Sequence, residues 1–288
     1  MTIKKTLIQS INTLTEAGIP NPELDARILV KHVTNLDEAT LIKNMNQLIS
    51  NRLIRRIETL VARRAQNEPL AYILVKKEFF GFNFMVNKNV LIPRPESEWL
   101  VEQSLDYLKN HKSKLKTVLD MGTGSGCIII SIMRQLKEER SKLTVSAFAA
   151  DNSAEALKVA LQNAKNNGTL NIEFIESDLF KNISVDIKFD LIIANLPYVP
   201  DNLTMEQSSN TILFEPQDAI FASDNGTSII KKFLTEAKKH LKDMDSLILI
   251  ELDPRNAEEL AKFAKKAGYK ADLIEDLAGK KRYLKTAL

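Results

Sequence analysis

The chain has 288 residues, of which 44% are hydrophobic and 27% are charged, and it contains only nine glycines, nine prolines and one cysteine. This composition excludes a collagen-like, low-complexity or largely disordered chain, provides enough apolar side chains for a sizeable core, and at this length is typical of two domains. Because no apolar stretch approaches the roughly 18 residues of a membrane span, and a single cysteine can form neither an internal disulfide nor a cysteine-based metal site, we expect a cytoplasmic protein without a membrane segment.

Residues 1–71 differ in composition from the rest of the chain, because they contain none of its 18 aromatic residues. Helical spacing and turn residues predict three helices there: 3–17, ended by Gly18; one from Pro22, capped by Asn21; and one along the apolar stripe 53–61. Residues 1–67 carry 10 basic and 6 acidic side chains, whereas the charges of the remaining chain nearly cancel. We therefore expect a helical domain over 1–71. Its basic surplus is either a solvated surface or a docking surface for an acidic or RNA-bound partner.

Strand and helix patterns alternate in the rest of the chain. Residues 72–88 contain the run Phe79-Phe80-Gly81-Phe82-Asn83-Phe84, in which aromatics flank a glycine, and are predicted to form a hairpin linker. Beyond this linker, strands are predicted at 117–121, 144–149, 172–175, 189–194 and 246–251, and helices at 126–137, 153–166, 227–241 and 254–267. This alternation predicts an α/β domain over 89–288 with a mostly parallel sheet covered on both faces.

A glycine-rich loop follows the first of these strands, with the sequence Gly122-Thr123-Gly124-Ser125-Gly126. Glycines let the backbone turn tightly and approach a ligand, and the helix that follows offers free N–H groups, although an ordinary strand–helix turn is the plainer alternative. The spacing differs from that of dinucleotide-binding loops, and the lysine of a phosphate-binding P-loop is missing. Asp151, next to Asn152 at the end of the second strand, can accept hydrogen bonds from ribose hydroxyls. These residues therefore favour an adenosine-containing ligand without a pyrophosphate, and S-adenosylmethionine (SAM) is the leading candidate.

The next two strand ends also carry candidate binding residues. Asp178 and Leu179 could hold the amino group and the face of an adenine, although a surface turn explains them equally well. The fourth strand ends in Asn195-Leu196-Pro197-Tyr198, where the asparagine oxygen and the following backbone carbonyls form a pair of acceptors for an NH₂ group beside an aromatic wall. Holding both hydrogens of an amide would aim its nitrogen at a sulfonium methyl and exclude water. No histidine or cysteine spacing typical of a metal site occurs, so we expect no metal.

These motifs make the chain similar to a known family. It resembles the bacterial peptide-chain-release-factor glutamine methyltransferases, the PrmC/HemK family, over nearly its whole length. The matching segments are Asn67-Glu68-Pro69-Leu70-Ala71-Tyr72-Ile73, Phe79-Phe80-Gly81, Val90-Leu91-Ile92-Pro93-Arg94-Pro95-Glu96-Ser97-Glu98, the loop 120–126, Phe189-Asp190-Leu191-Ile192, Asn195-Leu196-Pro197-Tyr198, Phe214-Glu215-Pro216, Asp276-Leu277-Ala278-Gly279 and Arg282. The Pro-Arg-Pro-Glu segment is the most specific, because general methyltransferases lack it.

The resemblance implies a class I SAM-dependent methyltransferase domain, with a Rossmann-like, mostly parallel seven-stranded sheet, preceded by a small helical bundle. It implies transfer of a methyl group from SAM to the side-chain amide of the glutamine in the Gly-Gly-Gln loop of class 1 release factors. The glycine loop would cradle the methionine part of SAM, Asp151 would bind the ribose, and Leu179 would lie beside the adenine. Asn195 and the carbonyl of Leu196 would hold the glutamine amide. The helical unit would grip the release factor, and we expect a monomer that makes no direct contact with nucleic acid.

One position departs from the family pattern. The family tetrapeptide is usually Asn-Pro-Pro-Tyr, whereas Leu196 here gives Asn-Leu-Pro-Tyr, which resembles the rRNA adenine dimethyltransferases. Those enzymes place their extra helical domain after the catalytic domain, not before it, so glutamine is the favoured acceptor and adenine in rRNA the alternative. A second alternative is a methyltransferase that acts on a glutamine of a ribosomal protein, but the Pro-Arg-Pro-Glu segment argues against it. A third alternative is a SAM-binding sensor or RNA-binding module without catalysis.

Overall fold

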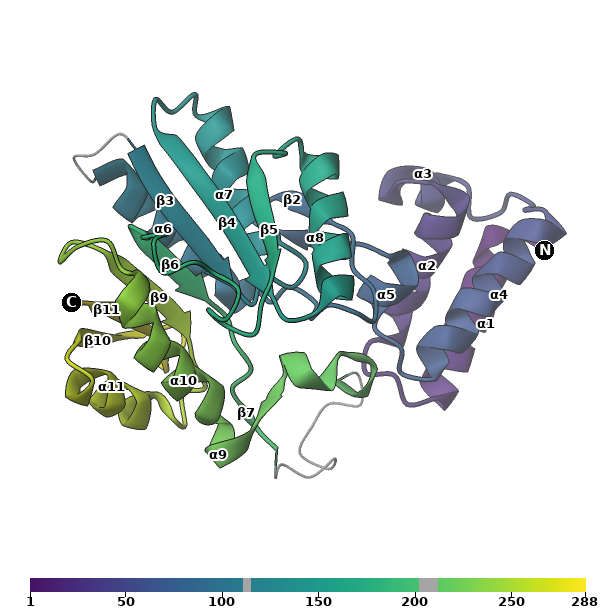
Figure 1. Cartoon of the computed structure of the whole chain (residues 1–288). Coiled ribbons are helices and arrows are strands. Elements are labelled where there is room, and N and C mark those ends of the chain that lie inside the picture. Colours follow the sequence, from purple (N-terminus) through teal and green to yellow (C-terminus); the bar gives the residue numbers. More distant parts are fainter. Residues whose placement is uncertain (111–114, 202–211) are drawn as a thin grey trace. The chain divides into compact units, whose positions relative to one another are not determined.

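The computed structural model describes residues 1–110, 115–201 and 212–288 (Figure 1). These residues form two compact units. Met1–Lys76 make up the first, with which Ile212–Phe214 group, and the second begins at Lys77. The change of unit therefore falls within the predicted linker 72–88.

The first unit is helical, and its helices are α1 (Ile3–Glu16), α2 (Pro22–Thr34), α3 (Glu38–Lys43), α4 (Asn51–Ala65) and α5 (Leu70–Leu74). Fully buried aliphatic residues such as Leu14, Leu29 and Ile57 form its core. An ion pair of 2.6 Å between Arg64 and Asp25 joins α4 to α2 in the interior. The predicted side-chain cap at Asn21 is wrong: the residue precedes α2, but its backbone (φ −127°, ψ 63°) is not extended, and its side chain makes no capping hydrogen bond to the described residues.

The second unit is built on a seven-stranded sheet with the order β10-β11-β9-β6-β3-β4-β5. Its strands are β3 (Leu115–Met121), β4 (Thr144–Asp151), β5 (Ile172–Glu176), β6 (Leu191–Ala194), β9 (Leu247–Glu251), β10 (Lys270–Glu275) and β11 (Lys281–Ala287). β11 is antiparallel to both of its neighbours, and the other pairs are parallel. The mostly parallel seven-stranded sheet is thereby confirmed.

Helices cover both faces of this sheet (Figure 1). On one face, α6 (Glu98–Asn110), α7 (Cys127–Glu138) and α8 (Ala154–Asn167) contribute to one apolar cluster, together with the hairpin formed by β1 (Lys77–Phe79) and β2 (Phe82–Phe84). On the other face, α10 (Ser228–Ala237) and α11 (Ala257–Lys266) pack in a second cluster. The short elements β7 (Val199–Pro200), β8 (Phe221–Ala222) and α9 (Ser223–Gly226) lie between β6 and α10 in the chain.

The predicted strands agree with the observed ones to within two residues at either end. The predicted helix 227–241 is shorter than expected, because its α-helical part ends at Ala237 and a 3₁₀ turn, Lys238–His240, follows. The predicted helix 254–267 begins late, because 254–256 form a turn. The pair β10–β11 was not predicted.

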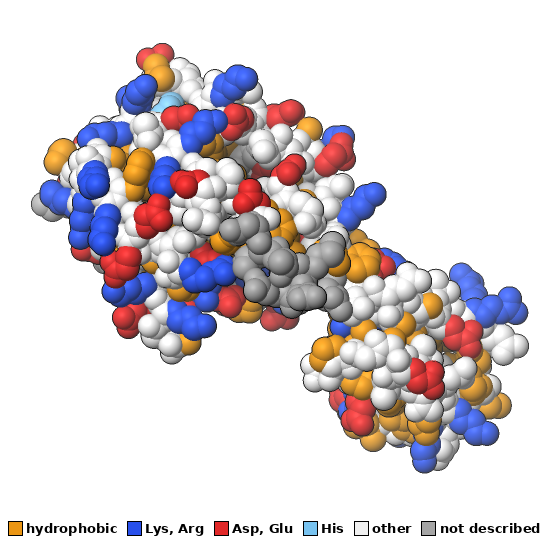
Figure 2. All heavy atoms as spheres, turned by 90° about the horizontal axis from the view of Figure 1, so that it is seen from below, with side chains coloured by type: hydrophobic (Ala, Val, Ile, Leu, Met, Phe, Trp, Pro, Cys, Tyr) orange, Lys and Arg blue, Asp and Glu red, His pale blue; other side chains and the backbone are white. Residues whose placement is uncertain are grey.

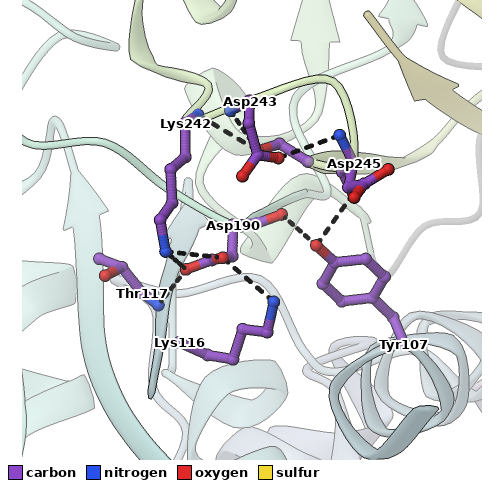
Figure 3. A network of polar contacts seen from close by, with 8 residues as sticks. Tyr107, Lys116, Thr117, Asp190, Lys242, Asp243 and Asp245 are labelled. Atoms are coloured by element: carbon purple, nitrogen blue, oxygen red, sulfur yellow. Dashed lines mark hydrogen bonds and ion pairs between the residues drawn. The ribbon is translucent and has the colours of Figure 1, made fainter. Parts of the chain in front are cut away.

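A buried polar network holds the amino ends of β3 and β6 together (Figure 3). Lys116 is fully buried, and its ammonium lies 3.1 Å from the Asp190 carboxylate, which also accepts hydrogen bonds from the Thr117 N–H and Lys242. The Tyr107 hydroxyl on α6 donates to the backbone carbonyls of Asp190 and Asp245. Burial raises the pKa of Asp190, but these hydrogen bonds outweigh it and hold the pKa below its usual value. This network fixes the end of the sheet opposite to the glycine loop.

Candidate active site

The carboxyl ends of four neighbouring strands meet at one edge of the sheet. Met121 of β3 is paired with Ala150 of β4 and with Ala194 of β6, which in turn is paired with Ile250 of β9. The residues that follow these ends are therefore brought together, as expected for the ligand crevice of an α/β sheet.

A cavity of about 510 Å³ opens at this edge, a size suited to a small organic ligand. The predicted residues that line it are Gly122, Thr123, Gly124, Ser125, Asp151, Asn152, Asp178, Leu179, Asn195, Leu196 and Pro197. Two predicted residues, Gly126 and Tyr198, do not line it. Nowhere in the described ranges do three or more His, Cys, Asp or Glu side chains gather in a way that could hold a metal ion.

The three loop glycines, all at positive φ, have different surroundings. A Cβ on Gly124 would meet nothing within 4 Å, which leaves room for a ligand. A Cβ on Gly122 would lie 2.9 Å from the Leu196 side chain, so this glycine allows the Asn195–Tyr198 segment to come close. A Cβ on Gly126 would lie 3.2 Å from that of Ala160 on α8, which indicates a role in helix packing.

Two carboxylates support the glycine loop. Asp151 accepts hydrogen bonds from the N–H groups of Gly124 (2.8 Å) and Ser153 (3.0 Å), and the Ser153 side chain caps α8. Burial raises the pKa of Asp151. The buried Asp120, which the sequence analysis did not assign, accepts a hydrogen bond from the Thr123 hydroxyl with one oxygen, while its other oxygen has no hydrogen-bond partner among the described residues. Burial raises the pKa of Asp120 to about 7. The open space at Gly124 fits a bound ligand.

The predicted adenine end of the cavity is formed by the turn after β5. Leu179 is buried at φ 50°, and the Ser177 hydroxyl donates to its carbonyl at 2.6 Å. The Asp178 carboxylate is paired with Lys232 of α10 at 3.1 Å, and both side chains line the cavity. Lys232 was not predicted, because nothing in its local sequence distinguishes it from the other lysines of α10.

The acceptor end is organised by Asn195. Its side-chain nitrogen donates to the Ser97 hydroxyl (2.8 Å) and to Glu251 Oε2 (3.2 Å), which leaves its oxygen to face the cavity. The Tyr198 hydroxyl donates to Glu251 Oε1 at 2.9 Å, and Tyr198 is not among the residues that line the cavity. Burial together with the nearby Glu251 carboxylate raises the pKa of Tyr198. Leu196 is 5% exposed and packs its side chain into the core.

The Pro-Arg-Pro-Glu segment forms another part of the wall. The buried Glu215 carboxylate accepts a hydrogen bond from the Ile92 N–H (3.0 Å) and pairs with Arg94 at 2.5 Å, and both Pro93 and Arg94 line the cavity. Farther along, Trp99 stacks on Tyr283 of β11 with ring centroids 4.1 Å apart. Glu215 thereby fixes a segment that precedes it by more than 120 residues.

Sequence reasoning assigned no role to three residues that shape this site. Ser97 and Glu251 hold Asn195, and a Cβ on Gly226 would lie 2.1 Å from the Tyr198 carbonyl oxygen, so only glycine allows that close approach. The signal for Glu251 was present, because it is a carboxylate at the end of the apolar run 247–250.

Comparisons with known proteins agree with this geometry. Residues 5–74 match the PrmC N-terminal domain, and residues 112–287 match a methyltransferase domain. A release factor glutamine methyltransferase of Deinococcus radiodurans is 32% identical over 99% of this chain and 98% of its own length, and one of Leptospira interrogans is 35% identical over 96% and 95%.

Two further similarities extend the comparison. A bifunctional methyltransferase of Rickettsia bellii is 35% identical over 99% of this chain, which spans only 55% of that longer protein. A crystal structure of a methyltransferase from Pyrococcus furiosus shares the fold, with a TM-score of 0.50 and 20% identity over 78% of this chain and 97% of the other. Among the described residues, no helix has the length and apolar character needed to cross a membrane.

Proposed function

Because the chain belongs to the family of release factor glutamine methyltransferases, we propose that it transfers a methyl group from SAM to the side-chain amide nitrogen of the glutamine in the Gly-Gly-Gln motif of class 1 peptide chain release factors. The observation that carries this proposal is the fixed amide of Asn195. Its nitrogen is engaged by Ser97 and Glu251, so its oxygen is presented to the cavity as an acceptor. Such an acceptor needs a hydrogen-bond donor, and the NH₂ group of a glutamine side chain can supply one.

The residues at the other side of the cavity fit SAM as the methyl donor. Gly124 and its neighbours would cradle the methionine part, Asp151 would accept hydrogen bonds from the ribose, and Asp178 with Leu179 would hold the adenine. When bound, SAM supplies a sulfonium methyl group, the electrophile of the reaction. Asp151 is held in place by two backbone N–H groups and keeps free lone pairs for the ribose, so the site is formed before the ligand arrives.

The acceptor residues would act by orienting a poor nucleophile. The lone pair of an amide nitrogen is delocalised into its carbonyl, and we assign the two N–H groups to the Asn195 oxygen and the Leu196 backbone carbonyl. Holding both hydrogens turns the nitrogen toward the methyl group and excludes water from it. The nitrogen would form one bond to the methyl carbon while the carbon–sulfur bond of the sulfonium breaks with its electron pair left on sulfur, and one amide proton is finally lost to bulk water. Since the Leu196 side chain is buried, leucine in place of the family's usual proline leaves this backbone acceptor available.

The helical unit is the proposed docking domain for the release factor. Arg52, Arg55 and Arg56 lie exposed on α4. Large apolar side chains outside this helix, such as Ile42 (57% exposed) and Leu48 (74%), also lie on the surface of the helical unit. Figure 2 shows hydrophobic side chains between charged ones on the visible face of this unit. A mixture of basic and apolar surface suits a protein partner with an acidic rim.

We also propose that the enzyme works as a monomer in the cytoplasm, where release factors act.

One experiment tests the proposed function directly. The protein is incubated with SAM and either a class 1 release factor or rRNA, and the added methyl group is located by mass spectrometry. We expect methylation of the Gly-Gly-Gln glutamine and none on the RNA. Methylated adenine with unmodified glutamine would instead establish the RNA activity to which the Asn-Leu-Pro-Tyr tetrapeptide points.

A further inference from the structure

We infer that Glu251 fixes the amide orientation of Asn195 and thereby makes the acceptor site selective for glutamine over glutamate. The inference rests on the proposed function, because it explains how the same site distinguishes two side chains that differ only by NH₂ and O⁻. Glu251 ends β9 and is 1% exposed, and it does not line the cavity. It is therefore a positioning residue that acts through Asn195.

Sheet register brings these two residues together. Ala194 of β6 is paired with Ile250 of β9, so the residues that follow them, Asn195 after β6 and Glu251 at the end of β9, lie at the same level. Ser97, at the start of α6, completes the group: its hydroxyl donates its single hydrogen to Glu251 Oε2 at 2.6 Å and accepts from the Asn195 nitrogen at 2.8 Å. Glu251 Oε2 also lies 3.2 Å from that nitrogen, so both acceptors face the same side of the Asn195 NH₂ group.

The opposite orientation of the Asn195 amide is unfavourable in this surrounding. Its oxygen would then lie about as far from Glu251 Oε2 and from the Ser97 oxygen as its nitrogen lies now, and the Ser97 hydrogen is already committed to Glu251. Two acceptors would face the amide oxygen without a hydrogen between them, and the NH₂ group would be turned into the cavity. A single well-placed acceptor therefore decides which end of Asn195 the substrate meets.

The charges around Glu251 support its role as an acceptor. Burial raises its pKa, while hydrogen bonds from Ser97 and Tyr198 and the positive charge of Arg282 on β11 act in the opposite direction. Glu96 is the nearby negative group. If Glu251 takes up a proton on Oε1, beside Tyr198, Oε2 still accepts from Ser97 and Asn195. A proton on Oε1 would therefore leave the orientation of Asn195 unchanged.

This arrangement has a consequence for selectivity. A glutamine NH₂ group can donate to both the Asn195 oxygen and the Leu196 carbonyl, whereas a glutamate carboxylate offers these two acceptors only further acceptors. Sites built to hydrogen-bond one group reject an analogue that leaves their buried polar atoms unpaired, typically by a factor of about 10⁴ or more. An enzyme with a freely rotating Asn195 would lose much of this discrimination.

The test compares Glu251→Leu with Glu251→Gln in the full-length protein. Leucine removes both acceptors, so we expect kcat on the release factor to fall by about 10²-fold, as for loss of one preorganised polar group. Glutamine can keep an oxygen toward Asn195 while its NH₂ donates to the Tyr198 hydroxyl, so we expect kcat within about tenfold of the wild type, roughly 1.4 kcal/mol or less in the barrier. SAM affinity should stay within about threefold of the wild type in both variants, since the change affects the acceptor end of the cavity and not the residues proposed to bind SAM.

Two further measurements separate positioning from a general structural role. A release factor with Gly-Gly-Glu in place of Gly-Gly-Gln should compete better against the normal factor for Glu251→Leu than for the wild-type enzyme. Adding Asn195→Ala to Glu251→Leu should cost little more than Asn195→Ala alone, because both changes remove the same acceptor. Multiplicative losses, or unchanged discrimination together with an unchanged kcat, would overturn the inference.

A pair of conservative changes covers the case in which Glu251→Leu fails to fold. Tyr198→Phe combined with Glu251→Gln removes the reason for the glutamine oxygen to face Asn195, so the double variant should lose far more activity than the two single variants together. Slow hydrogen exchange of the Asn195 side-chain amide in wild-type protein, and fast exchange in this double variant, would support the orientation independently of any activity; equal exchange in both would refute it. If the wild type leaves release factors unmodified but shows the slow exchange, the proposed substrate is wrong and the role of Glu251 stands.

Discussion

The hydrogen bonds of Asp151 allow its contribution to SAM binding to be worked out before a measurement. Its carboxylate holds the Gly124 and Ser153 N–H groups and, in the proposed complex, also accepts from the ribose. Hydrogen bonds to a charged group are worth about 1.5–3 kcal/mol. Asp151→Ala should therefore weaken SAM binding by roughly 10- to 150-fold, at about 1.4 kcal/mol for each factor of ten. The loss should lie toward the upper end of this range, because the glycine loop is released as well.

Isothermal calorimetry of SAM binding measures this loss, and circular dichroism shows whether the variant is folded. Ser153→Ala is a matched control at the adjacent position: it removes the cap of α8, which costs stability by about 1 kcal/mol, but no proposed ligand contact. We expect it to lower the melting temperature and to keep the SAM affinity. A folded Asp151→Ala variant that binds SAM as tightly as the wild type would refute the assignment of this carboxylate to the ribose.

Asn195→Ala should lower kcat by on the order of 10²-fold while SAM affinity changes little, as steady-state kinetics and calorimetry will show. Leu196→Pro retains the backbone carbonyl, so turnover on the release factor should stay within about tenfold; a complete loss would mean that the leucine side chain itself is required. Gly226→Ala puts a Cβ at a residue with φ 87° and 2.1 Å from the Tyr198 carbonyl oxygen. It should lower the free energy of unfolding, measured with denaturant, by about 1–3 kcal/mol, and it should also lower turnover. Asp190→Asn leaves the fully buried lysine of β3 without its negative partner, and should destabilise the fold by about 3–5 kcal/mol at neutral pH. Because the folded-state pKa of Asp190 is lowered, its stabilisation is present above its unfolded pKa of about 3.9 and is lost as pH falls through the folded value, so the variant's disadvantage should shrink in acid. A disadvantage that is constant down to pH 2 would contradict this reading.

Patterns that repeat along the chain predicted the fold well. Four strand–helix alternations gave the parallel part of the sheet, because each strand is an apolar run and each helix has helical spacing of apolar residues. β10 and β11 were not predicted, because buried and exposed residues do not alternate regularly along them. Charged residues also interrupt both strands, including Lys270, Asp272, Lys281 and Lys285. Their place in the sheet is set by the pairing of β11 with β9, which local sequence does not encode.

The parts of the candidate site that lie within one short segment of the chain were predictable from the sequence. The glycine loop, Asp151 and the Asn195 tetrapeptide can be recognised in the sequence, because their residue types stand directly after a predicted strand. Glu251 also stands at the end of an apolar run, but its role and that of Glu215 were not predictable, because their partners, such as Ser97 and Arg94, come from segments over 100 residues away. Only the folded chain shows that these carboxylates orient the residues that touch the cavity.

The two ends of the cavity thus differ in how far apart in the chain their contacts are made. The hydrogen bond from Gly124 to Asp151 spans 27 residues, whereas that from Ser97 to Glu251 spans 154. The glycine loop and Asp151 belong to one strand–helix–strand segment, and Asp178 and Leu179 follow at the end of the next strand, β5, while the acceptor end also needs β9. Contacts that close long loops are the ones that partial opening of a protein removes, since their entropy cost is recovered only in the complete fold. Opening of the carboxyl-terminal strands is therefore expected to abolish methyl transfer while SAM is still bound, so that the enzyme becomes inactive with its cofactor site intact.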